Sequence, residues 1–457
     1  MKFAIFGTGN YARAFSKVFK NDDIFGYIDN DKNKQGKEFE GKKIFAPNEI
    51  EYDNIDYVII AVFKSKDITA QLTGMGVDES KIISYKDIGG KFGLHIYINN
   101  CGDQIEIKHW KFTKKSLLVM VHELSRTGVP VAAMHLAELL RELGYVVVIG
   151  SLRNGSMACE LQERNIPYIE NLEAFYGCDD FKTFINSFDG VIMGTLAVAQ
   201  FTGIFESYRN PIFWWINETH EDVFENYKLP KHRANIFYLA DGDRTVKMFK
   251  TYYPERDVSN LYYYLPEEDE RKSVVSNEKL CFGMVGSHVR RKGQDLLVAA
   301  IKRIPDEIRK NMVFYIIGPE NGSYTKEWKT QADMIPEIKM LGELSQSELK
   351  KMYSEFDVLI CPSRDDTVPI VVTQAFQNSI PCIVSNQVGQ SMYMKNDYGG
   401  YVFESENTEQ LSDAIVSMYN NKEKRARQGR EGREIFEKYF SKNAVKQEVI
   451  NKIIRYL

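Results

Sequence analysis

The sequence predicts an α/β protein assembled from repeated units of strand, glycine-containing loop and helix. Apolar strands predicted at residues 2–6, 117–121 and 280–285 each run into a loop with glycine and then into a helix. A further strand, at residues 357–361, enters a polar loop that a short helix and another strand follow. Parallel sheets are built from such repeats, and their ligands bind at the carboxyl ends of the strands.

Length and composition place the chain among globular proteins. At 457 residues it has room for about three domains. A hydrophobic fraction of 44% with 27% charged residues allows sizeable cores. The formal net charge of −4 argues against a general nucleic-acid-binding protein. Six scattered cysteines without a C-x-x-C pair are typical of reduced thiols in a cytosol.

No stretch of the sequence has the pattern of a signal peptide, and the longest apolar runs are too short to cross a bilayer. Residues 422–457 are basic, with 11 Lys and Arg against 5 Asp and Glu. Such a tail is most often a solvated face, and the alternative is contact with an anionic membrane surface. We therefore expect a cytoplasmic protein, with peripheral contact at the inner face of the membrane as the alternative.

Residues 1–92 are predicted to form a small Rossmann-like domain. Gly7, Gly9 and Asp29 have the spacing of a dinucleotide fingerprint, in which glycines admit a phosphate and the acid binds a ribose. The unit is only about half of a full dinucleotide fold. Three interpretations stay open: a module for assembly or positioning, a site for an NAD-type or other nucleotide, and hydride transfer. Residues 93–113 are predicted to be a linker or an edge strand pair.

Two larger α/β domains follow, at residues 114–271 and 272–440. In the second of them, Gly286 and Ser287 follow a strand and precede Arg291 and Lys292, a pattern typical of a phosphate-binding loop at a helix N-terminus. In the first, Asp241-Gly-Asp243 has the form of a metal-binding Asp-x-Asp. We interpret it as a strand end and a helix N-cap, and we expect no metal.

The stretch Cys361 to Gln390, CPSRDDTVPIVVTQAFQNSIPCIVSNQVGQ, resembles the donor-site motif of glycosyltransferase family 4, retaining enzymes of the GT-B fold. That motif has two glutamates with seven residues between them, and Asp366 and Gln374 stand in their places. The resemblance covers residues from about 115 to the C-terminus. It implies two Rossmann-like lobes, an acceptor lobe and a donor lobe, with the helix at 441–457 returning to the acceptor lobe.

The resemblance also implies roles for individual residues. Asp366 would face the donor sugar and Gln374 would bind the ribose, with Arg291 and Lys292 at the leaving diphosphate and His122 at the acceptor hydroxyl. The other residues implied at the donor are Gly286, Ser287, Thr367, Val368, Leu341 and Gly342, and those on the acceptor side are Gly128, Asn217 and Glu218.

The function that the resemblance implies is sugar transfer from a nucleotide sugar, by default a UDP-sugar, with retention at the anomeric carbon. The expected acceptor is a glycan or a lipid-linked glycan in the synthesis of cell-surface polysaccharide such as capsule, and no cofactor is required. The substitutions at both glutamate positions leave an alternative, a non-catalytic GT-B subunit that binds a partner transferase or a glycan. A third reading is an NAD-linked sugar-nucleotide enzyme that acts through the N-terminal domain.

Overall fold

The computed structural model describes residues 1–62, 65–85, 87–92, 95–175, 178–267, 278–320 and 322–457. The chain divides into two compact units. Unit 1 contains Met1–Trp214, Tyr227–Phe237 and Leu457, and unit 2 contains Trp215–Asn226 and Tyr238–Tyr456. The predicted boundary at residues 271 and 272 lies outside the described residues, as does the start of the predicted linker at residue 93. The domain limits given above therefore stay predictions.

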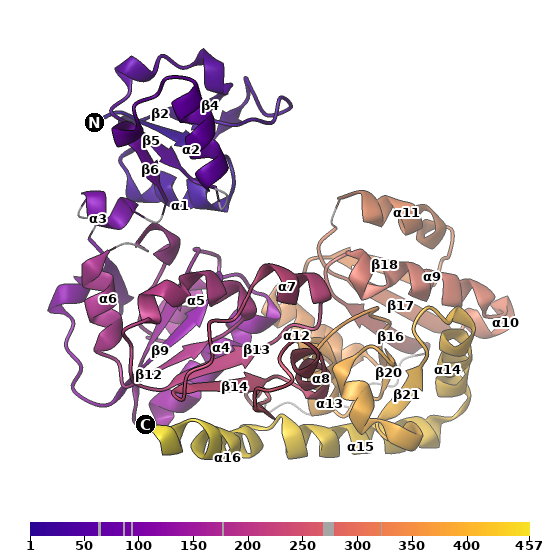
Figure 1. Ribbon diagram of the computed structural model, residues 1–457. Coiled ribbons are helices and arrows are strands. Elements are labelled where there is room, and N and C mark those ends of the chain that lie inside the picture. The colour runs from indigo at the N-terminus through magenta and orange to yellow at the C-terminus, as the bar shows by residue number, and fades with distance from the viewer. Residues whose placement is uncertain (63–64, 86, 93–94, 176–177, 268–277, 321) are drawn as a thin grey trace. The chain divides into compact units, whose positions relative to one another are not determined.

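Unit 1 opens with a six-stranded sheet in the order β3-β4-β2-β1-β5-β6 (Figure 1). Its pairs are parallel except for β3 with β4. The strands are β1 (Phe3–Phe6), β2 (Ile24–Ile28), β3 (Glu38–Phe39), β4 (Lys42–Phe45), β5 (Tyr57–Ile60) and β6 (Ile82–Ser84), and the helices are α1 (Asn10–Val18), α2 (Ser65–Gly74) and α3 (Ile88–Phe92).

A second sheet in unit 1 has the order β13-β12-β9-β10-β11-β7-β8. The hairpin of β7 and β8 joins its edge antiparallel to β11, and the other pairs are parallel. Its strands are β7 (Tyr97–Asn100), β8 (Asp103–Glu106), β9 (Ser116–Val121), β10 (Val146–Ser151), β11 (Tyr168–Ile169), β12 (Gly190–Met193) and β13 (Ile212–Ile216), and its helices include α4 (Gly128–Glu142), α5 (Ala158–Glu163) and α6 (Asp179–Asn186).

Unit 2 is built on a six-stranded parallel sheet in the order β18-β17-β16-β19-β20-β21. β16 and β19 are parallel neighbours in this sheet. The turn after β16 and the loop after β19 therefore lie next to each other at the carboxyl edge. The strands are β16 (Leu280–Val285), β17 (Met312–Ile317), β18 (Ile338–Gly342), β19 (Val358–Cys361), β20 (Cys382–Ser385) and β21 (Gly400–Phe403). The strands β14 (Ile236–Ala240) and β15 (Val258–Asn260) also pair in parallel.

Helices cover the strands of unit 2, and among them α9 packs against α14 and α13 against α15. The sequence explains α9, because its apolar residues recur at helical spacing and all of Leu296, Leu297, Ala300 and Ile301 are buried. The helices are α7 (Glu221–Asn226), α8 (Asp243–Tyr252), α9 (Gln294–Arg303), α10 (Asp306–Arg309), α11 (Gly322–Asp333), α12 (Gln346–Glu355), α13 (Ile370–Gln377), α14 (Thr408–Asn420), α15 (Lys422–Tyr439) and α16 (Lys442–Lys452).

Three helix ends can be related to the sequence. Gly144 follows α4 with a φ of 94°, the left-handed conformation expected of a C-terminal glycine. The Asp241-Gly-Asp243 stretch is a strand end and a helix N-cap as predicted, with Gly242 as the N-cap of α8 and Asp243 in its first turn. Pro369 is the N-cap of α13.

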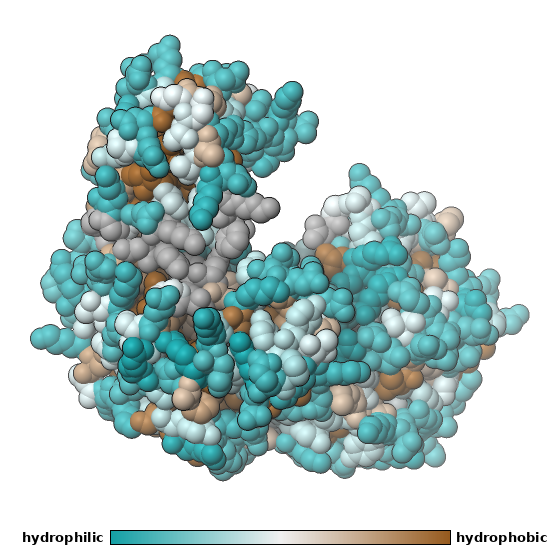
Figure 2. All heavy atoms as spheres, in the orientation of Figure 1, coloured by the Kyte–Doolittle hydropathy of each residue, from teal (hydrophilic) through white to brown (hydrophobic). Residues whose placement is uncertain are grey.

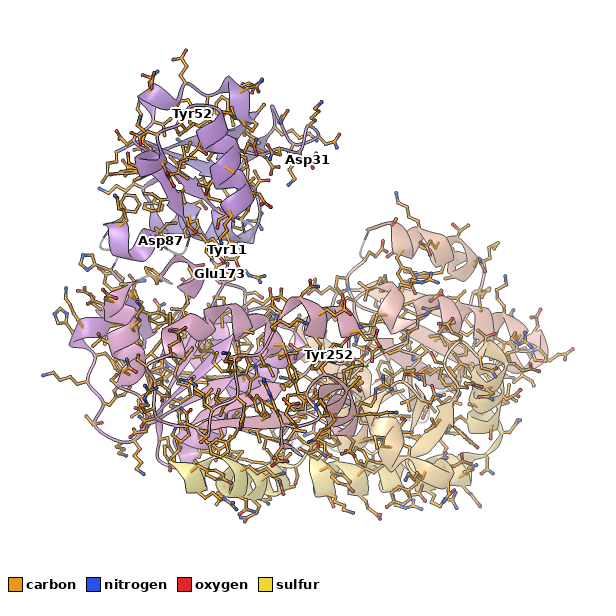
Figure 3. The ribbon with its side chains drawn as sticks, viewed as in Figure 1. Tyr11, Asp31, Tyr52, Asp87, Glu173 and Tyr252 are labelled. Atoms are coloured by element: carbon orange, nitrogen blue, oxygen red, sulfur yellow. The ribbon has the colours of Figure 1, made fainter. Side chains whose placement is uncertain are left out.

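The N-terminal sheet domain packs onto the rest of unit 1 through helices α1 and α3, which contact the 3-10 helix Leu172–Phe175. The ring of Tyr11 lies 4.6 Å from that of Tyr85, and the charge of Glu173 acts on the Tyr11 hydroxyl. Figure 3 shows Tyr11 pointing toward the segment that carries Glu173. Burial, together with Glu173, raises the pKa of Tyr11 well above its ordinary value. The start of α1 is therefore part of a packed junction.

The surface in view in Figure 2 is mainly hydrophilic, with apolar atoms scattered between charged side chains. Large exposed hydrophobic residues occur singly, for example Phe25, Met75 and Met334. In the described part of the chain, no helix combines the length and the apolar character needed to span a bilayer.

A first prediction concerns the close packing of β16 in unit 2. A methyl group on Gly283 would overlap the ring of the fully buried Phe356. We expect Gly283→Ala to lower the free energy of unfolding by about 1–3 kcal/mol through overpacking, measured by urea denaturation. Phe356→Leu in the same chain should recover part of the loss. Additive effects of the two substitutions would contradict the contact.

Candidate functional site

The turn after β16, Gly286 to Gly293, brings a cationic pair to the carboxyl edge of the sheet in unit 2. Gly286 has a φ of 155° and Gly293 one of 77°, conformations that favour glycine. The buried Gln294 donates from its side-chain amide to the carbonyl of Ser287 at 3.0 Å and so holds the turn. Arg291 and Lys292 form the short 3-10 turn that precedes α9.

Asp366 lies opposite this turn, in the loop Ser363–Val368 that we call the donor loop. One oxygen of its carboxylate lies 2.6 Å from Lys292 Nζ and the other 3.0 Å from Arg291. Ser363 donates to it at 3.2 Å. Burial alone would raise the pKa of Asp366, but Lys292 and Arg291 hold it below its ordinary value. The two cations and the carboxylate form one ion-paired group.

Arg364 ties the donor loop to the turn. Its guanidinium donates to both oxygens of Asp295 at 2.8 Å, and it also pairs with Glu406. A further bond of 2.7 Å reaches the carbonyl of Arg290, and the Arg364 N–H donates to the carbonyl of Arg291 at 2.7 Å. Arginine has the planar fork that such a set of acceptors needs.

Asp365 connects the donor loop to the segment after β13 and to α8. Its carboxylate accepts from Thr219 at 2.9 Å and from Arg244 at 2.9 Å, and His220 Nδ1 lies 3.2 Å away. Arg244 also donates to the side chain of Gln387 at 2.8 Å. These contacts all lie within unit 2.

The far end of the donor loop is packed on both sides. A Cβ on Gly389 would overlap the carbonyl of Thr367, and one on Gly242 would lie 2.9 Å from Val368. Asp241, the residue before Gly242, is buried after the end of β14. The loop conformation at Thr367 and Val368 is therefore set by two close approaches.

Gln374 has a different set of neighbours. It lines a cavity of about 190 Å³ between α12 and α13. The other lining residues are Gln346, Ser347, Leu349, Lys350, Tyr353, Gln377 and Asn378.

The strand β18 ends with two residues that the sequence placed at the donor. Leu341 is 38% exposed, which is high for a leucine in a strand. Gly342 has a φ of 65°, and its carbonyl accepts from the N–H of Gly318 at 2.7 Å. An exposed apolar side chain at this edge offers a flat contact to a ring.

The acceptor-side residues are divided between the two units. In unit 1, burial lowers the pKa of His122, and its Nδ1 has no hydrogen-bond partner among the described residues. Gly128 begins α4 with open space where a side chain would stand. In unit 2, Asn217 donates to the carbonyl of Trp215 at 2.8 Å and its N–H donates to Glu218 at 2.9 Å.

In the N-terminal domain, side chains of the domain itself bind the candidate ribose ligand of the dinucleotide fingerprint. Asp29 accepts from the hydroxyl of Thr8 at 2.5 Å and from Lys34 at 3.1 Å. A Cβ on Gly7 would come within 2.7 Å of Val62, and Gly9 has open space around it. Gly7 is thus explained by packing, independently of any ligand. Among the described residues, no group of three His, Cys, Asp or Glu side chains is placed to hold a metal ion.

Comparisons with known proteins agree with this architecture. A sequence profile described as glycosyl-transferase family 4 matches residues 113–260, and one described as glycosyl transferases group 1 matches residues 266–435. The chain therefore carries a domain of the glycosyl-transferase family 4 type followed by one of the glycosyl transferases group 1 type. A third profile, described as C2185-like, N-terminal, matches residues 1–83, so the glycosyltransferase domains follow a separate module.

Two curated relatives illustrate the match. An uncharacterized glycosyltransferase of Methanocaldococcus jannaschii is 29% identical over 171 residues, 37% of this chain and 47% of that protein. The UDP-Gal:alpha-D-GlcNAc-diphosphoundecaprenol alpha-1,3-galactosyltransferase of Escherichia coli is 25% identical over 149 residues, 32% of this chain and 38% of that protein. The chain therefore matches less than half the length of these relatives.

A solved structure shows the fold. Anabaena HepE in complex with UDP-glucose superposes with a TM-score of 0.64 at 13% identity, and the match covers 75% of this chain and 100% of that one. The GT-B architecture predicted from the sequence is confirmed by this likeness.

The sequence did not identify several residues that surround the candidate donor site. Arg364 and Asp365 lie in the donor loop, but no sequence motif assigns them a role. No sequence pattern marks Arg244 either. Asp241 was noticed only as part of a strand end. A signal was available for Arg364 and Asp365, because the loop Ser-Arg-Asp-Asp is unusually rich in charge for a segment between two apolar elements.

The second prediction tests Arg364, the arginine that joins the donor loop to the turn after β16. Arg364→Lys keeps the charge but loses the fork that spans Asp295, Glu406 and the Arg290 carbonyl. We expect it to lower the free energy of unfolding by about 1–3 kcal/mol, measured by urea denaturation. Arg303→Lys, at an arginine that is 49% exposed, is the matched control and should change little. Equal effects of the two substitutions would show that the fork geometry is unimportant.

Proposed function

We propose that this protein is a retaining glycosyltransferase that moves a sugar from a UDP-sugar to a glycan or lipid-linked acceptor in cell-surface polysaccharide synthesis. The observation that carries the proposal is the pairing of Lys292 and Arg291 at the start of α9 with Asp366 in the donor loop. The names of the relatives support it, since HepE is described with UDP-glucose and the Escherichia coli enzyme by a UDP-Gal donor and a diphosphoundecaprenol acceptor.

The chemical problem in this reaction is charge. The sugar becomes oxocarbenium-like while negative charge develops on the departing diphosphate, and pre-placed donors stabilise that charge most. Lys292 and Arg291 would receive the diphosphate, with the backbone of Gly286 and Ser287 beside them. The start of α9 adds the positive end of a helix dipole. The backbone N–H of Val368 would be the contribution of the donor loop, since Pro369 has none to offer.

Asp366 would serve two purposes in turn. Before the donor binds, its carboxylate is the counter-ion of Lys292 and Arg291 and keeps both cations oriented. A diphosphate would take over part of that pairing, and Asp366 would then accept hydrogen bonds from the sugar hydroxyls. Aspartate is one methylene shorter than the glutamate of the family motif, so the sugar would sit nearer the cationic turn.

The nucleoside would lie along the helices that leave the same edge. Gln374 would bind the ribose diol through its amide, more weakly than a carboxylate because charge-assisted hydrogen bonds are roughly twice as strong. Gln374 also lines a cavity of about 190 Å³ between α12 and α13. Leu341, exposed beside Gly342, would support the base.

On the acceptor side, the candidate residues are His122 and Gly128 in unit 1 and Asn217 and Glu218 in unit 2. A neutral asparagine cannot take up a proton, so His122 is the acid-base candidate. For a lipid-linked acceptor, the basic tail would meet the membrane. Several of its cations are already paired within the chain, however, as in Lys424 with Asp397 and Arg433 with Glu437.

The N-terminal domain fits a positioning role better than a catalytic one. Its candidate ribose ligand, Asp29, is engaged by Thr8 and Lys34, and α1 takes part in the junction with the 3-10 helix Leu172–Phe175. An NAD-linked activity would instead require binding of NAD(H) that weakens on Gly9→Ala or Asp29→Ala, which calorimetry can measure.

The third prediction tests the diphosphate site directly. Lys292→Ala removes the more buried cation, and we expect kcat/KM for transfer or hydrolysis of a UDP-sugar to fall about 10²–10³-fold. The donor is first chosen by a thermal-shift screen of nucleotide sugars, in which ligand at 100 times Kd stabilises by about 2.7 kcal/mol. Turnover is then followed by release of UDP.

Lys310→Ala is the matched control, because Lys310 is an exposed lysine of the same unit at the end of α10. Its kcat/KM should stay near that of the unaltered protein. Absence of turnover with every donor in the unaltered protein would favour the non-catalytic subunit. Full activity of Lys292→Ala would rule out this diphosphate site.

A further inference from the structure

One arginine of unit 1 lies between two glutamates that belong to different parts of that unit. Arg153 follows β10, and its Nε donates to Oε1 of Glu173 at 3.3 Å. Its Nη1 lies 3.6 Å from Oε2 of Glu123, in the segment after β9. We call this arrangement the Arg153 bridge. It connects the segment after β9 with the 3-10 helix Leu172–Phe175.

Glu173 lies where the N-terminal domain packs onto the rest of unit 1. It is 1% exposed and belongs to the 3-10 helix Leu172–Phe175, which α1 and α3 contact. Figure 3 shows Tyr11 of α1 pointing toward the segment of Glu173. The fit at α3 is close, because a Cβ on Gly89 would come within 3.0 Å of the Cβ of Cys178 and 3.1 Å of its backbone nitrogen. The N-terminal domain therefore rests directly on the helix that carries Glu173.

Glu123 lies at the other end of the Arg153 bridge, beside the candidate acceptor residue His122. Its Oε1 is 3.8 Å from Nε2 of His122, an ion-pair distance when the imidazole is protonated. The same oxygen accepts from the hydroxyl of Ser125 at 2.6 Å, and that hydroxyl lies 2.8 Å from the hydroxyl of Thr127. Thr127 is the N-cap of α4, directly before Gly128. The orientation of Glu123 therefore affects both acceptor-side candidates of unit 1.

The backbone holds the same three segments together. The N–H of Leu152 donates to the carbonyl of Val121 at 3.1 Å, and the carbonyl of Leu152 accepts from the N–H of Glu173 at 3.4 Å. A Cβ on Gly155 would overlap the carbonyl of Leu124, so the loop after β10 lies directly against the segment after β9. Close packing of this kind transmits small shifts from one segment to the next.

We propose that Arg153 is a positioning residue through which the N-terminal domain orients Glu123 and His122 on the acceptor side. Glu173 holds Nε of the guanidinium at the place that the packed domain sets, and Nη1 then faces Glu123. The acceptor-side role of His122 rests on the proposed function, whereas the Arg153 bridge depends only on contacts within unit 1. The N-terminal domain needs no ligand of its own for this role.

The charges next to His122 act on it in opposite directions. Burial is the main cause of the lowered pKa of His122, while Glu123 raises this pKa and Arg153 lowers it. Removal of the Arg153 charge should therefore raise the pKa of His122. Removal of the Glu173 charge should lower it, because Arg153 then pairs with Glu123 alone and leaves less attraction for the imidazolium. A purely structural role of Arg153 would not produce shifts of opposite sign.

The fourth prediction follows the imidazole of His122 by NMR in the full chain. Histidine labelled with ¹³C at Cε1 gives one signal for each of the seven histidines, and His122→Gln identifies the signal of His122. We expect Arg153→Gln to raise the pKa of His122 by about half a pH unit and Glu173→Gln to lower it by a smaller amount. Arg153→Lys keeps the charge and should shift the pKa less than Arg153→Gln does.

Arg209→Gln is the matched control, because Arg209 is an exposed arginine of unit 1 that donates to the carbonyl of Glu206 in its own loop. It should leave the titration of His122 unchanged. Shifts of the same sign in Arg153→Gln and Glu173→Gln would overturn the inference, as would an unmoved titration in both.

The part played by the N-terminal domain has a test of its own. Gly89→Val pushes α3 away from Cys178, whereas Gly74→Val, at the end of α2 in the same domain, meets open space. We expect the first to speed hydrogen exchange at Leu172–Phe175 and to shift the His122 signal, and the second to do neither. Faster exchange without a shift of His122 overturns the role of the domain, and unchanged exchange in Gly89→Val overturns the close contact on which it depends.

These measurements need neither donor nor acceptor, so they can be separated from the proposed function. The thermal-shift screen of nucleotide sugars tests that function. If no nucleotide sugar stabilises the unaltered protein, the proposed function fails, and the shifts of His122 still show the Arg153 bridge. If a nucleotide sugar binds but the charge substitutions leave His122 unmoved, the inference fails and the proposed function stands.

Discussion

The proposed donor site depends on one ion-paired group, Asp366 with Lys292 and Arg291. Lys292 and Asp366 stand 74 residues apart in the chain. The sheet makes the pairing possible, because β16 and β19 are neighbours and their loops leave at the same edge. Charge then fixes the details: two cations at a helix start would repel each other without a carboxylate between them. Arg364 and Asp365 hold the loop that supplies this carboxylate, so much of the surrounding polar structure serves to place a single aspartate.

The sequence was sufficient for the elements and for the ion-paired group. The apolar runs predict β16 and β19, and the glycines predict the turn after β16. The motif around Asp366 indicates that this turn and the donor loop meet. It was insufficient for Asp365, whose partners Thr219 and Arg244 stand 146 and 121 residues away in segments without a recognisable pattern. Contacts of that kind depend on how two loops of unpredicted shape approach each other. The burial of Asp241 could not be predicted for a related reason. The sequence shows an aspartate at the end of a strand but does not show which residues will surround it.

The N-terminal domain shows where a motif explains structure without identifying a ligand. Gly7 is required by Val62, which leaves no room for a side chain, and the hydroxyl of Thr8 satisfies Asp29 within the domain. The same residues in the same spacing would also suit a dinucleotide. The packing of Tyr11 at the junction adds a structural reason for the sequence at the start of α1. The dinucleotide fingerprint is therefore good evidence for the strand, turn and helix that contain it. It is weaker evidence that a dinucleotide binds there.

The two departures from the family motif have a common electrostatic consequence. Gln374 carries no charge, and the single carboxylate of Asp366 is shared by two cations, so the group of Lys292, Arg291 and Asp366 keeps a net charge of about +1. An excess positive charge at a helix start is what a diphosphate needs. Glutamate at both positions would supply stronger hydrogen bonds to the sugar and ribose, at the cost of one more negative charge near the nucleotide. Under the proposed function, the two substitutions would shift the balance of donor recognition from the sugar and ribose hydroxyls toward the diphosphate.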